Sequence, residues 1–380
     1  MPTDKGFALS SDLDLRQELL DGYERHTRRP NDEPELPAKR RRKCALPKLR
    51  IAAITNDTVA TLASLAYSVK SLPNSRVAMG LIVGSGSNAT IPMKLSSLNE
   101  SKTRQIRTND PSADQVLVST EWTMSGAAGP LRELGIVTKW DRDLELASSR
   151  PGFQPLEYMV GGRYIGELVR IITCDYLTSA LQVPREAMPA KLAEPYGITT
   201  DFLSFVVASS SSYESLVDDL RQNLPSPPSS DWEWNTESAG ILRKVASAVQ
   251  ARASALVAAA IIGLLACADH VHLKSPGNLQ CPNTSGSNGT ARTEDCVPEL
   301  GSLRSPEELV VAVSGGVIQH YPKYKEMIQR HIDQILVRCG PQDGGKSVFL
   351  REASDGGIIG VGVLAGTTTG KIERIIGSAL

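Results

Sequence analysis

Three glycine-rich turns, each placed directly after a short apolar run, constrain this chain more than any other feature. The turns are Gly84-Ser85-Gly86, Ser314-Gly315-Gly316 and Ser354-Asp355-Gly356-Gly357. Short apolar runs bounded by glycine are typical of buried strands. Glycine at a strand end lets backbone N–H groups face a phosphate or a base, because no side chain stands in the way. One such turn is common in proteins, but three in one chain favour a nucleotide cleft.

Predicted strands and helices alternate along the chain. The predicted strands are Leu49–Thr55, Val77–Val83, Ala89–Lys94, Gln115–Ser119, Glu308–Val313 and Ser347–Arg351, and the main predicted helices are Ser11–Arg25, Asp57–Val69, Glu157–Leu181, Ser238–Ala268 and Lys323–Arg338. The second and third strands form a hairpin around the first glycine turn. This alternation indicates the α/β class. None of the glycine turns follows the P-loop pattern or the Gly-x-Gly-x-x-Gly pattern of dinucleotide folds.

Composition narrows the classes of function. The 380 residues predict two domains, or three, at about 150 residues each. Lys and Arg number 41 against 42 Asp and Glu, so the net charge of −1 gives no overall attraction to nucleic acid or to an anionic membrane. The six cysteines have no paired short spacing, which disfavours a zinc site and suits a reducing compartment. No signal peptide is evident, and Ala253–Ala268 is shorter than the ~18–20 residues of a membrane span. We therefore expect a cytoplasmic protein with no membrane partner and no metal held by protein side chains.

Two segments predict exposed chain. The basic run Lys39–Lys43 suits a nuclear localisation signal, a regulatory partner or a nucleic-acid contact, and equally a solvated charge cluster. Residues 274–305 are rich in Gly, Ser, Asn and Pro without periodicity, which predicts a disordered insertion.

Three acidic residues are candidates for chemistry. Asp57 lies between a predicted strand and a predicted helix, where a carboxylate can accept a proton from a substrate hydroxyl, or simply cap the helix. Glu121 and Glu157 lie on either side of a long loop. They could hold the hydroxyls of a polar ligand, or be ordinary surface acids.

Several blocks resemble the hexokinase family. They include Ile54–Leu62, which contains Asn56-Asp57-Thr58-Val59, and Met79–Ala89, which contains the first glycine turn followed by Asn88. The resemblance continues in Thr120-Glu121-Trp122, Thr138–Asp141, Ser149–Gln154, Leu156–Leu168 and Ser354–Gly357, and it runs in order from Lys5 to about Ala365. The block from Glu157 to Leu168 is the most specific of these.

The resemblance implies the actin-like ATPase (ribonuclease H-like) fold, in which two lobes close over a hexose and ATP. On this basis residues 1–48 would be a remnant of the small lobe plus a basic linker, and 49–380 the large lobe. Asp57 would be the general base on the 6-hydroxyl of a glucose-like hexose. The sugar would be held by Lys5, Asn56, Asn88, Glu121 and Glu157. The nucleotide would be framed by Gly84, Ser85, Gly86, Ser314, Gly315, Ser354, Asp355 and Gly356.

The sequence also departs from the family pattern. Family members carry an early Leu-Asp-Leu-Gly-Gly-Thr-Asn turn that grips the ATP phosphates and helps to place Mg²⁺, and this chain has none. Ser314 stands where the family has Asp, Tyr158 where it has Lys, and Gly161 where it has Ser. Losing an electrostatic group in phosphoryl transfer typically costs a factor of ~10²–10³ or more.

The expected function is therefore ATP:hexose 6-phosphotransfer at the start of glycolysis, weak or absent in this chain, with Mg²⁺ held through ATP. The sequence fits either a truncated gene model of an ATP:hexose 6-phosphotransferase or a genuinely short, non-catalytic relative. The alternative is a regulatory protein that senses sugar without phosphorylating it and acts in the nucleus.

Overall fold

The structure, a computed structural model, describes residues 14–27, 47–69, 74–273, 307–339, 342 and 345–377, with side chains to residue 367. Three predicted features lie outside the described residues: Lys5, the run Lys39–Lys43 and the whole of the predicted insertion at 274–305. The chain divides into a smaller unit, Met1–Asn56 with Val361–Leu380, and a larger unit, Asp57–Gly360. The assignment of 1–48 and 49–380 to two lobes stays a prediction.

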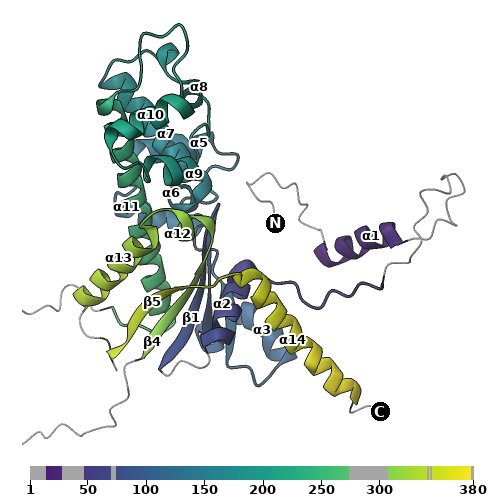
Figure 1. Cartoon of the computed structure of the whole chain (residues 1–380). Helices are drawn as coiled ribbons and strands as arrows, with labels where there is room; N and C mark the ends of the chain where they lie inside the picture. Colours follow the sequence, from purple (N-terminus) through teal and green to yellow (C-terminus); the bar gives the residue numbers. More distant parts are fainter. Residues whose placement is uncertain are drawn as a thin grey trace, which may run out of the picture. The chain divides into compact units, whose positions relative to one another are not determined.

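A five-stranded sheet forms the centre of the larger unit (Figure 1). Its strands are β1 (Ser75–Val83), β2 (Ser87–Lys94), β3 (Gln115–Ser119), β4 (Glu308–Ser314) and β5 (Ser347–Glu352), in the order β3-β2-β1-β4-β5. β2 is antiparallel to β1 and β3, whereas β4 is parallel to β1 and β5. The structure confirms the predicted hairpin of β1 and β2 and the three other predicted strands of this sheet, β3, β4 and β5.

Side chains of β4 alternate between the two faces of the sheet. Leu309, Val311 and Val313 belong to the large hydrophobic core with the long helices. Val310 and Ala312 pack instead with residues of α2 (Asp57–Val69), such as Leu65, in a second core. Both faces are therefore covered by helices, which is why the whole of β4 reads as apolar in the sequence. This confirms the predicted α/β class.

The remaining helices of the larger unit form mostly a stack at one end of the sheet (Figure 1). They are α3 (Glu100–Asn109), α4 (Ala128–Glu133), α5 (Lys139–Ala147), α6 (Glu157–Val160), α7 (Gly162–Ser179), α8 (Ala190–Ala193), α9 (Thr200–Phe202), α10 (Tyr213–Asn223), α11 (Thr236–Cys267), α12 (Gly316–His320) and α13 (Tyr324–Cys339), with short turns η3 (Leu95–Ser97), η4 (Ser125–Ala127), η5 (Arg185–Ala187) and η6 (Leu203–Val207). The last helix, α14 (Gly356–Gly377), runs from the larger unit into residues of the smaller one.

The predicted single helix Glu157–Leu181 is wrong in one respect. It is two helices, α6 and α7, separated by Gly161 in an extended conformation with φ −75° and ψ 137°. The first N–H groups of α7 bond to the glycine turn after β1 and not to carbonyls of α6. This tertiary contact explains the break, and helical periodicity alone does not reveal it.

The predicted helix Ser238–Ala268 corresponds to α11, which begins with a capping box between Asn235 and Ser238. Within the described residues, α11 is the one helix whose length and apolar composition would allow it to cross a membrane. Half of its apolar window is nevertheless buried inside this protein. Polar side chains such as Gln250 and Ser254 are buried in it too. We interpret α11 as a core helix of the stack, and the predicted helix at this position is confirmed.

The smaller unit contains α1 (Leu15–Thr27), where the sequence predicted a helix. The hydroxyl of Tyr23 donates to the carbonyl of Pro47 at 2.5 Å. The predicted strand Leu49–Thr55 is wrong, because described residues 47–56 form neither helix nor strand. Ile54 is 50% exposed there. A strand needs a neighbour for its N–H and C=O groups, and no described segment pairs with this one.

Candidate functional site

The first glycine turn joins β1 to β2 and supports the start of α7. The N–H of Gly84 donates to the carbonyl of Gly86 at 2.9 Å, which closes the turn. The carbonyls of Gly84 and Ser85 accept hydrogen bonds from the N–H groups of Gly162 and Arg163, at 2.8 and 3.0 Å. The turn thereby satisfies two of the N–H groups that a helix leaves unpaired at its N-terminus.

The second glycine turn lies against the first. Gly315 has φ 119°, a conformation that side-chain-bearing residues rarely adopt, and a Cβ there would lie 2.5 Å from the carbonyl oxygen of Val83. A Cβ on Gly84 would be 3.6 Å from both the Cα of Gly315 and the N of Gly316. A Cβ on Gly162 would lie 2.7 Å from the oxygen of Gly84. Gly162 and Gly315 therefore have no room for a Cβ, whereas a Cβ on Gly84 would make ordinary contacts. Two adjoining glycine turns are the kind of surface that a phosphate group can approach closely.

The third glycine turn has a different neighbour. A Cβ on Gly356 would be 3.4 Å from the Cα of Thr61 in α2. Asp355 has φ 51°. Because β4 and β5 are parallel, Ser314 and Ser354 follow strands that end at the same edge of the sheet. The structure thus brings Gly84 and Gly315 into contact and places Ser354, Asp355 and Gly356 beside α2.

Asp57 begins α2, whose first turn is held close to the sheet. A Cβ on Gly80 of β1 would collide with the carbonyl oxygen of Thr58. A Cβ on Gly360 would collide with that of Ala60 from the opposite side. The exposed carboxylate of Asp57 accepts from the N–H of Thr58 at 2.9 Å. The hydroxyl of Thr58 bonds to that of Thr90 on β2.

Asn88 and Glu121 hold each other directly. The Nδ2 of Asn88 donates to Oε1 of Glu121 at 2.7 Å, and the N–H of Glu121 donates to Oδ1 of Asn88 at 3.1 Å. The hydroxyl of Ser119 also donates to Oε1 of Glu121 at 2.9 Å. Glu121 has φ 46°, which a residue other than glycine adopts at some energetic cost. Such outliers gather at functional sites, where the surrounding structure enforces them.

Glu157 is buried, with 2% of its surface exposed. It is the first residue of α6, and its Oε2 accepts from the N–H of Ser87 at 3.0 Å. Ser87 pairs with Val83 at the closed end of the hairpin and directly precedes Asn88. A buried carboxylate is costly unless it is hydrogen-bonded, so this bond is part of what allows Glu157 to be there.

The three acids are therefore anchored to one short piece of β2. Glu157 bonds to Ser87, Glu121 bonds to Asn88, and Asp57 is tied to Thr90 through its neighbour Thr58. Hydrogen bonds thus join two of these acids, and the neighbour of the third, to nearby residues of β2, and their convergence on one sugar-sized hollow stays a prediction. The roles of these residues stay predictions. Of the other predicted sugar contacts, Asn56 precedes Asp57 but belongs to the smaller unit, and Lys5 lies outside the described residues.

Sequence reasoning missed the polar contacts beneath the site. The hydroxyl of Thr200 donates to the carbonyl of Gly162 at 2.5 Å and accepts from the N–H of Gly166 at 3.0 Å. Glu167 accepts from Arg170 and from the N–H of Tyr196. These contacts lock the first turns of α7 under the glycine hairpin. Thr199, which caps α9, was the available signal, since Thr before a helical segment indicates a cap.

No group of three or more His, Cys, Asp or Glu side chains among the described residues could hold a metal ion. These side chains therefore do not fit a Mg²⁺ ion held by protein groups alone. The N–H groups of Gly84 and Gly162 already donate to carbonyls, so a phosphate group would have to be bound by other N–H groups of the adjoining glycine turns.

Comparisons with known proteins agree with this architecture. The family model described as Hexokinase matches residues 78–367. The chain is 24% identical over 317 residues to "Hexokinase-2, chloroplastic" of Nicotiana tabacum, covering 83% of this chain and 53% of that one. It is 27% identical over 318 residues to "Hexokinase-5" of Oryza sativa subsp. japonica, again covering 83% of this chain and 53% of that one. The chain thus spans about half the length of these curated relatives.

Solved structures show the same fold. A hexokinase from Schistosoma mansoni complexed with glucose superimposes with a TM-score of 0.57 and 24% identity, over 83% of this chain and 57% of that one. A second structure, described as a crystal structure of hexokinase, gives 0.56 and 21%, over 83% of this chain and 55% of that one. The predicted resemblance and the predicted actin-like ATPase fold are therefore confirmed, and this chain belongs to the hexokinase family.

Proposed function

We propose that this chain binds a glucose-like hexose at the acids anchored on β2 and frames ATP at the adjoining glycine turns. The observation that carries the proposal is the attachment of Glu157, Glu121 and Asp57 to consecutive parts of one strand. Carboxylates that converge on one place can accept hydrogen bonds from several hydroxyls of the same ligand. A hexose offers that pattern of hydroxyl donors around a small ring.

The chemistry that suits this arrangement is phosphoryl transfer to a hydroxyl. Asp57 would take the proton from the 6-hydroxyl, because it is an exposed carboxylate at the start of α2. Glu121, Glu157 and Asn88 would fix the other hydroxyls. A site with such polar groups rejects analogues that lack a hydroxyl, because the protein group is then left unpaired. MgATP would supply the phosphoryl group and neutralise its charge.

A second function, sugar sensing without phosphorylation, is supported by the nucleotide side of the site. Ser314 ends β4 where the family has Asp, so that position offers no carboxylate. Tyr158 replaces a lysine, and its hydroxyl donates to the carbonyl of Arg150 at 2.8 Å. The sugar side keeps its acids. On this proposal the protein acts in the cytoplasm, or in the nucleus if Lys39–Lys43 directs import.

Glucose calorimetry, run beside a coupled assay for glucose 6-phosphate with MgATP, tests both functions on the full 380-residue chain. Glu157→Gln should weaken glucose binding by a factor of ~10² or more, because it loses a charge-assisted bond and leaves buried groups unpaired. Asp57→Asn should leave binding within a few-fold of wild type and abolish any turnover. The matched control is Glu133→Gln, an exposed acid of α4, which should change neither.

The results separate the two functions. Turnover near ~10 s⁻¹, a typical enzyme value, selects the kinase. Tight glucose binding without turnover selects the sensor. Failure of the wild-type chain to bind glucose, or equal loss in Glu157→Gln and Glu133→Gln, would refute both.

A further inference from the structure

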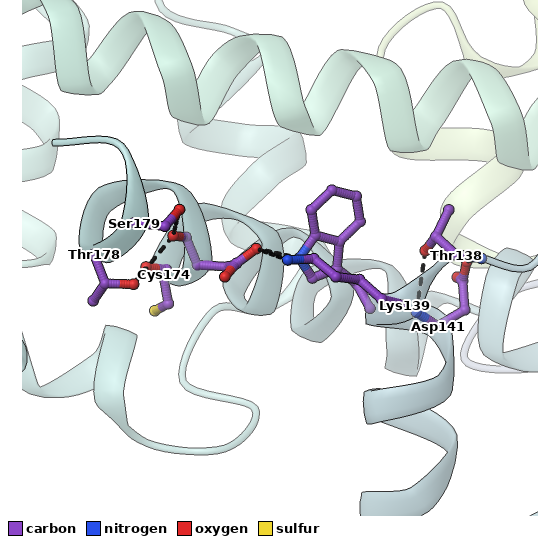
Figure 2. Close-up of polar contacts among 8 residues, drawn as sticks. Thr138, Lys139, Asp141, Cys174, Thr178 and Ser179 are labelled. Atoms are coloured by element: carbon purple, nitrogen blue, oxygen red, sulfur yellow. Dashed lines mark hydrogen bonds and ion pairs between the residues drawn. The ribbon is translucent and has the colours of Figure 1, made fainter. Parts of the chain in front are cut away.

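A pocket of about 330 Å³ lies in the helical stack, between α5, α7, η5 and α8. Its size is that of pockets that bind small organic molecules. The residues that line it include neither the three acids Asp57, Glu121 and Glu157 nor any residue of the glycine turns. Figure 2 shows the wall where α5 and α7 face each other, with Lys139 on one helix and Cys174 on the other.

This wall is fixed by hydrogen bonds that are already made. The carboxylate of Asp175 accepts from Nζ of Lys139 at 2.7 Å and from Nε1 of Trp140 at 2.8 Å. The Nζ of Lys139 also lies 5.0 Å from the centre of the indole ring of Trp140. These contacts hold the indole in place, so the pocket has a flat apolar surface before any ligand arrives. Asp175 and Lys139 neutralise each other.

Two arginines line the pocket from α7 and η5. Arg170 donates from Nε and Nη2 to Glu167, at 2.7 and 2.6 Å, and from Nη1 to the carbonyl of Leu192 at 2.6 Å. A guanidinium has five N–H donors, so two of those of Arg170 remain beyond these bonds, and the sulfur of Cys174 lies within hydrogen-bond reach of the guanidinium. Arg185 is exposed and has no ion pair with any residue that the structure describes. It is therefore an uncompensated positive charge at the pocket.

Cys174 lies close to both arginines and adds no negative charge. Burial raises the pKa of its thiol, even though the charges of Arg170 and Arg185 act in the opposite direction. Its Sγ donates to the carbonyl of Leu192 at 3.0 Å. Ile171 and Met188 add apolar surface to the lining.

We propose that this pocket binds a small organic anion, with a carboxylate or phosphate group at Arg170 and Arg185 and a flat apolar body against Trp140. The anionic group would pair with Arg185, and it could also accept hydrogen bonds from the N–H groups of Arg170 that remain available. The remaining exposed acid of the lining, Asp143, is on α5, so the anionic group is favoured at the arginines. A neutral polyhydroxyl sugar would not pair with the positive charge of Arg185. This proposal is independent of the sugar site.

Phenyl phosphate is the test ligand, because it combines one flat ring with one anionic group. The full chain labelled with ¹⁵N would be titrated while the indole N–H resonance of Trp140 is followed, with Trp140→Phe identifying the signal. Benzyl alcohol supplies the ring without the charge, and inorganic phosphate supplies the charge without the ring. The matched variants are Arg185→Ala and Arg142→Ala, since Arg142 is an exposed arginine of α5 that does not line the pocket.

We expect saturable binding of phenyl phosphate with a dissociation constant of about 1 mM or below. Benzyl alcohol and inorganic phosphate should each bind at least ~10-fold more weakly, and Arg185→Ala should weaken phenyl phosphate ~10-fold, against less than ~2-fold for Arg142→Ala. The other tryptophan resonances show that each variant is folded. Saturating glucose should not displace phenyl phosphate. Equal binding of either partial ligand, equal loss in both arginine variants, or no saturable shift of Trp140 would overturn the proposal.

Discussion

The edge of the sheet that carries the glycine turns and the helical stack above it are held together in different ways. At the edge, Gly315 and Gly162 allow backbone to touch backbone, and few side chains intervene. In the stack, polar contacts of charged side chains join the helices: Arg252 of α11 binds Asp141 of α5 with two bonds of 2.7 Å, and Arg170 of α7 donates to the carbonyl of Leu192 in α8. The edge should therefore be destabilised when a side chain is added at Gly315 or Gly162, and the stack when a buried charge is removed.

The largest effect is expected at the edge. Gly315→Ala combines an unfavourable φ with a collision against the oxygen of Val83, and we expect a loss of about 3–5 kcal/mol in the free energy of unfolding. The neighbouring control is Gly316→Ala, where a Cβ would meet nothing within 4 Å. It should change stability by less than ~1 kcal/mol. Urea unfolding measures both, and equal effects would show that the junction tolerates side chains.

A slightly smaller loss is expected in the stack. Arg252→Ala leaves Asp141, of which 4% of the side chain is exposed, as an unpaired buried charge. We expect about 2–4 kcal/mol of destabilisation, below the usual range for a fully buried pair because Arg252 is 22% exposed. Lys244→Ala, at an exposed lysine of the same helix, should cost less than ~0.5 kcal/mol. A small effect of Arg252→Ala would mean that water replaces the pair.

The same ion pair makes the stack sensitive to acid. Burial alone would raise the pKa of Asp141, but the hydrogen bonds and charge of Arg252, together with Thr138, lower it below its ordinary value. A lowered pKa in the folded state contributes stability above the unfolded value of about 3.9, and this contribution is lost as pH falls through the folded value. Asp141→Asn should therefore flatten the stability profile below about pH 4. If Asp141→Asn lost stability in acid as steeply as the wild type does, the pKa of Asp141 would not be the cause of the acid sensitivity.

An intermediate effect is expected where the two regions meet. Thr200→Val removes the hydroxyl that bridges Gly162 and Gly166, and we expect a loss of about 1–3 kcal/mol because two buried backbone groups lose their partner. Thr200→Ser keeps the hydroxyl and should recover most of this loss. Thermal unfolding distinguishes the two variants. If serine does not rescue, packing of the methyl group and not the hydrogen bonds holds α7.

The smallest effect has the opposite sign. Gly263 lies inside α11, and a Cβ there would meet nothing within 4 Å. Gly263→Ala should stabilise the protein by about 0.5–1 kcal/mol, because alanine loses less backbone freedom on folding. Read beside Gly315→Ala, it tests whether glycine is required only where backbone contacts backbone. Destabilisation measured in urea would contradict the open space around this position.

The two regions also differ in what the sequence reveals. β4 and its glycine turn were predicted because a strand buried on both faces gives a continuous apolar run. The run Leu49–Thr55 is also apolar but forms no strand. An apolar run in the sequence does not indicate whether a neighbouring strand is available to pair with it. The break at Gly161 comes from bonds to Gly84 and Ser85, which are far away in the sequence. Local sequence patterns therefore predicted most of the helices and strands. Contacts with distant segments determined whether a strand forms and where a helix is interrupted.

The candidate site shows the same division. Asp57, Glu121 and Glu157 were identified by motif, but their common attachment to β2 depends on the sheet order. The pocket in the stack was not predicted, because Lys139, Asp175 and Arg185 come from three segments without a shared motif. Charged residues that come together only in the folded chain have no characteristic spacing in the sequence, so a pocket that they form cannot be predicted from a motif.

The most direct test of the central claim is a crystal structure of the full chain soaked with glucose. We expect one sugar beside β2, with hydroxyl oxygens within hydrogen-bond distance of the carboxylates of Glu121 and Glu157, and with the 6-hydroxyl facing Asp57. Glucose bound elsewhere, or a sugar that leaves either glutamate without a contact, would contradict it.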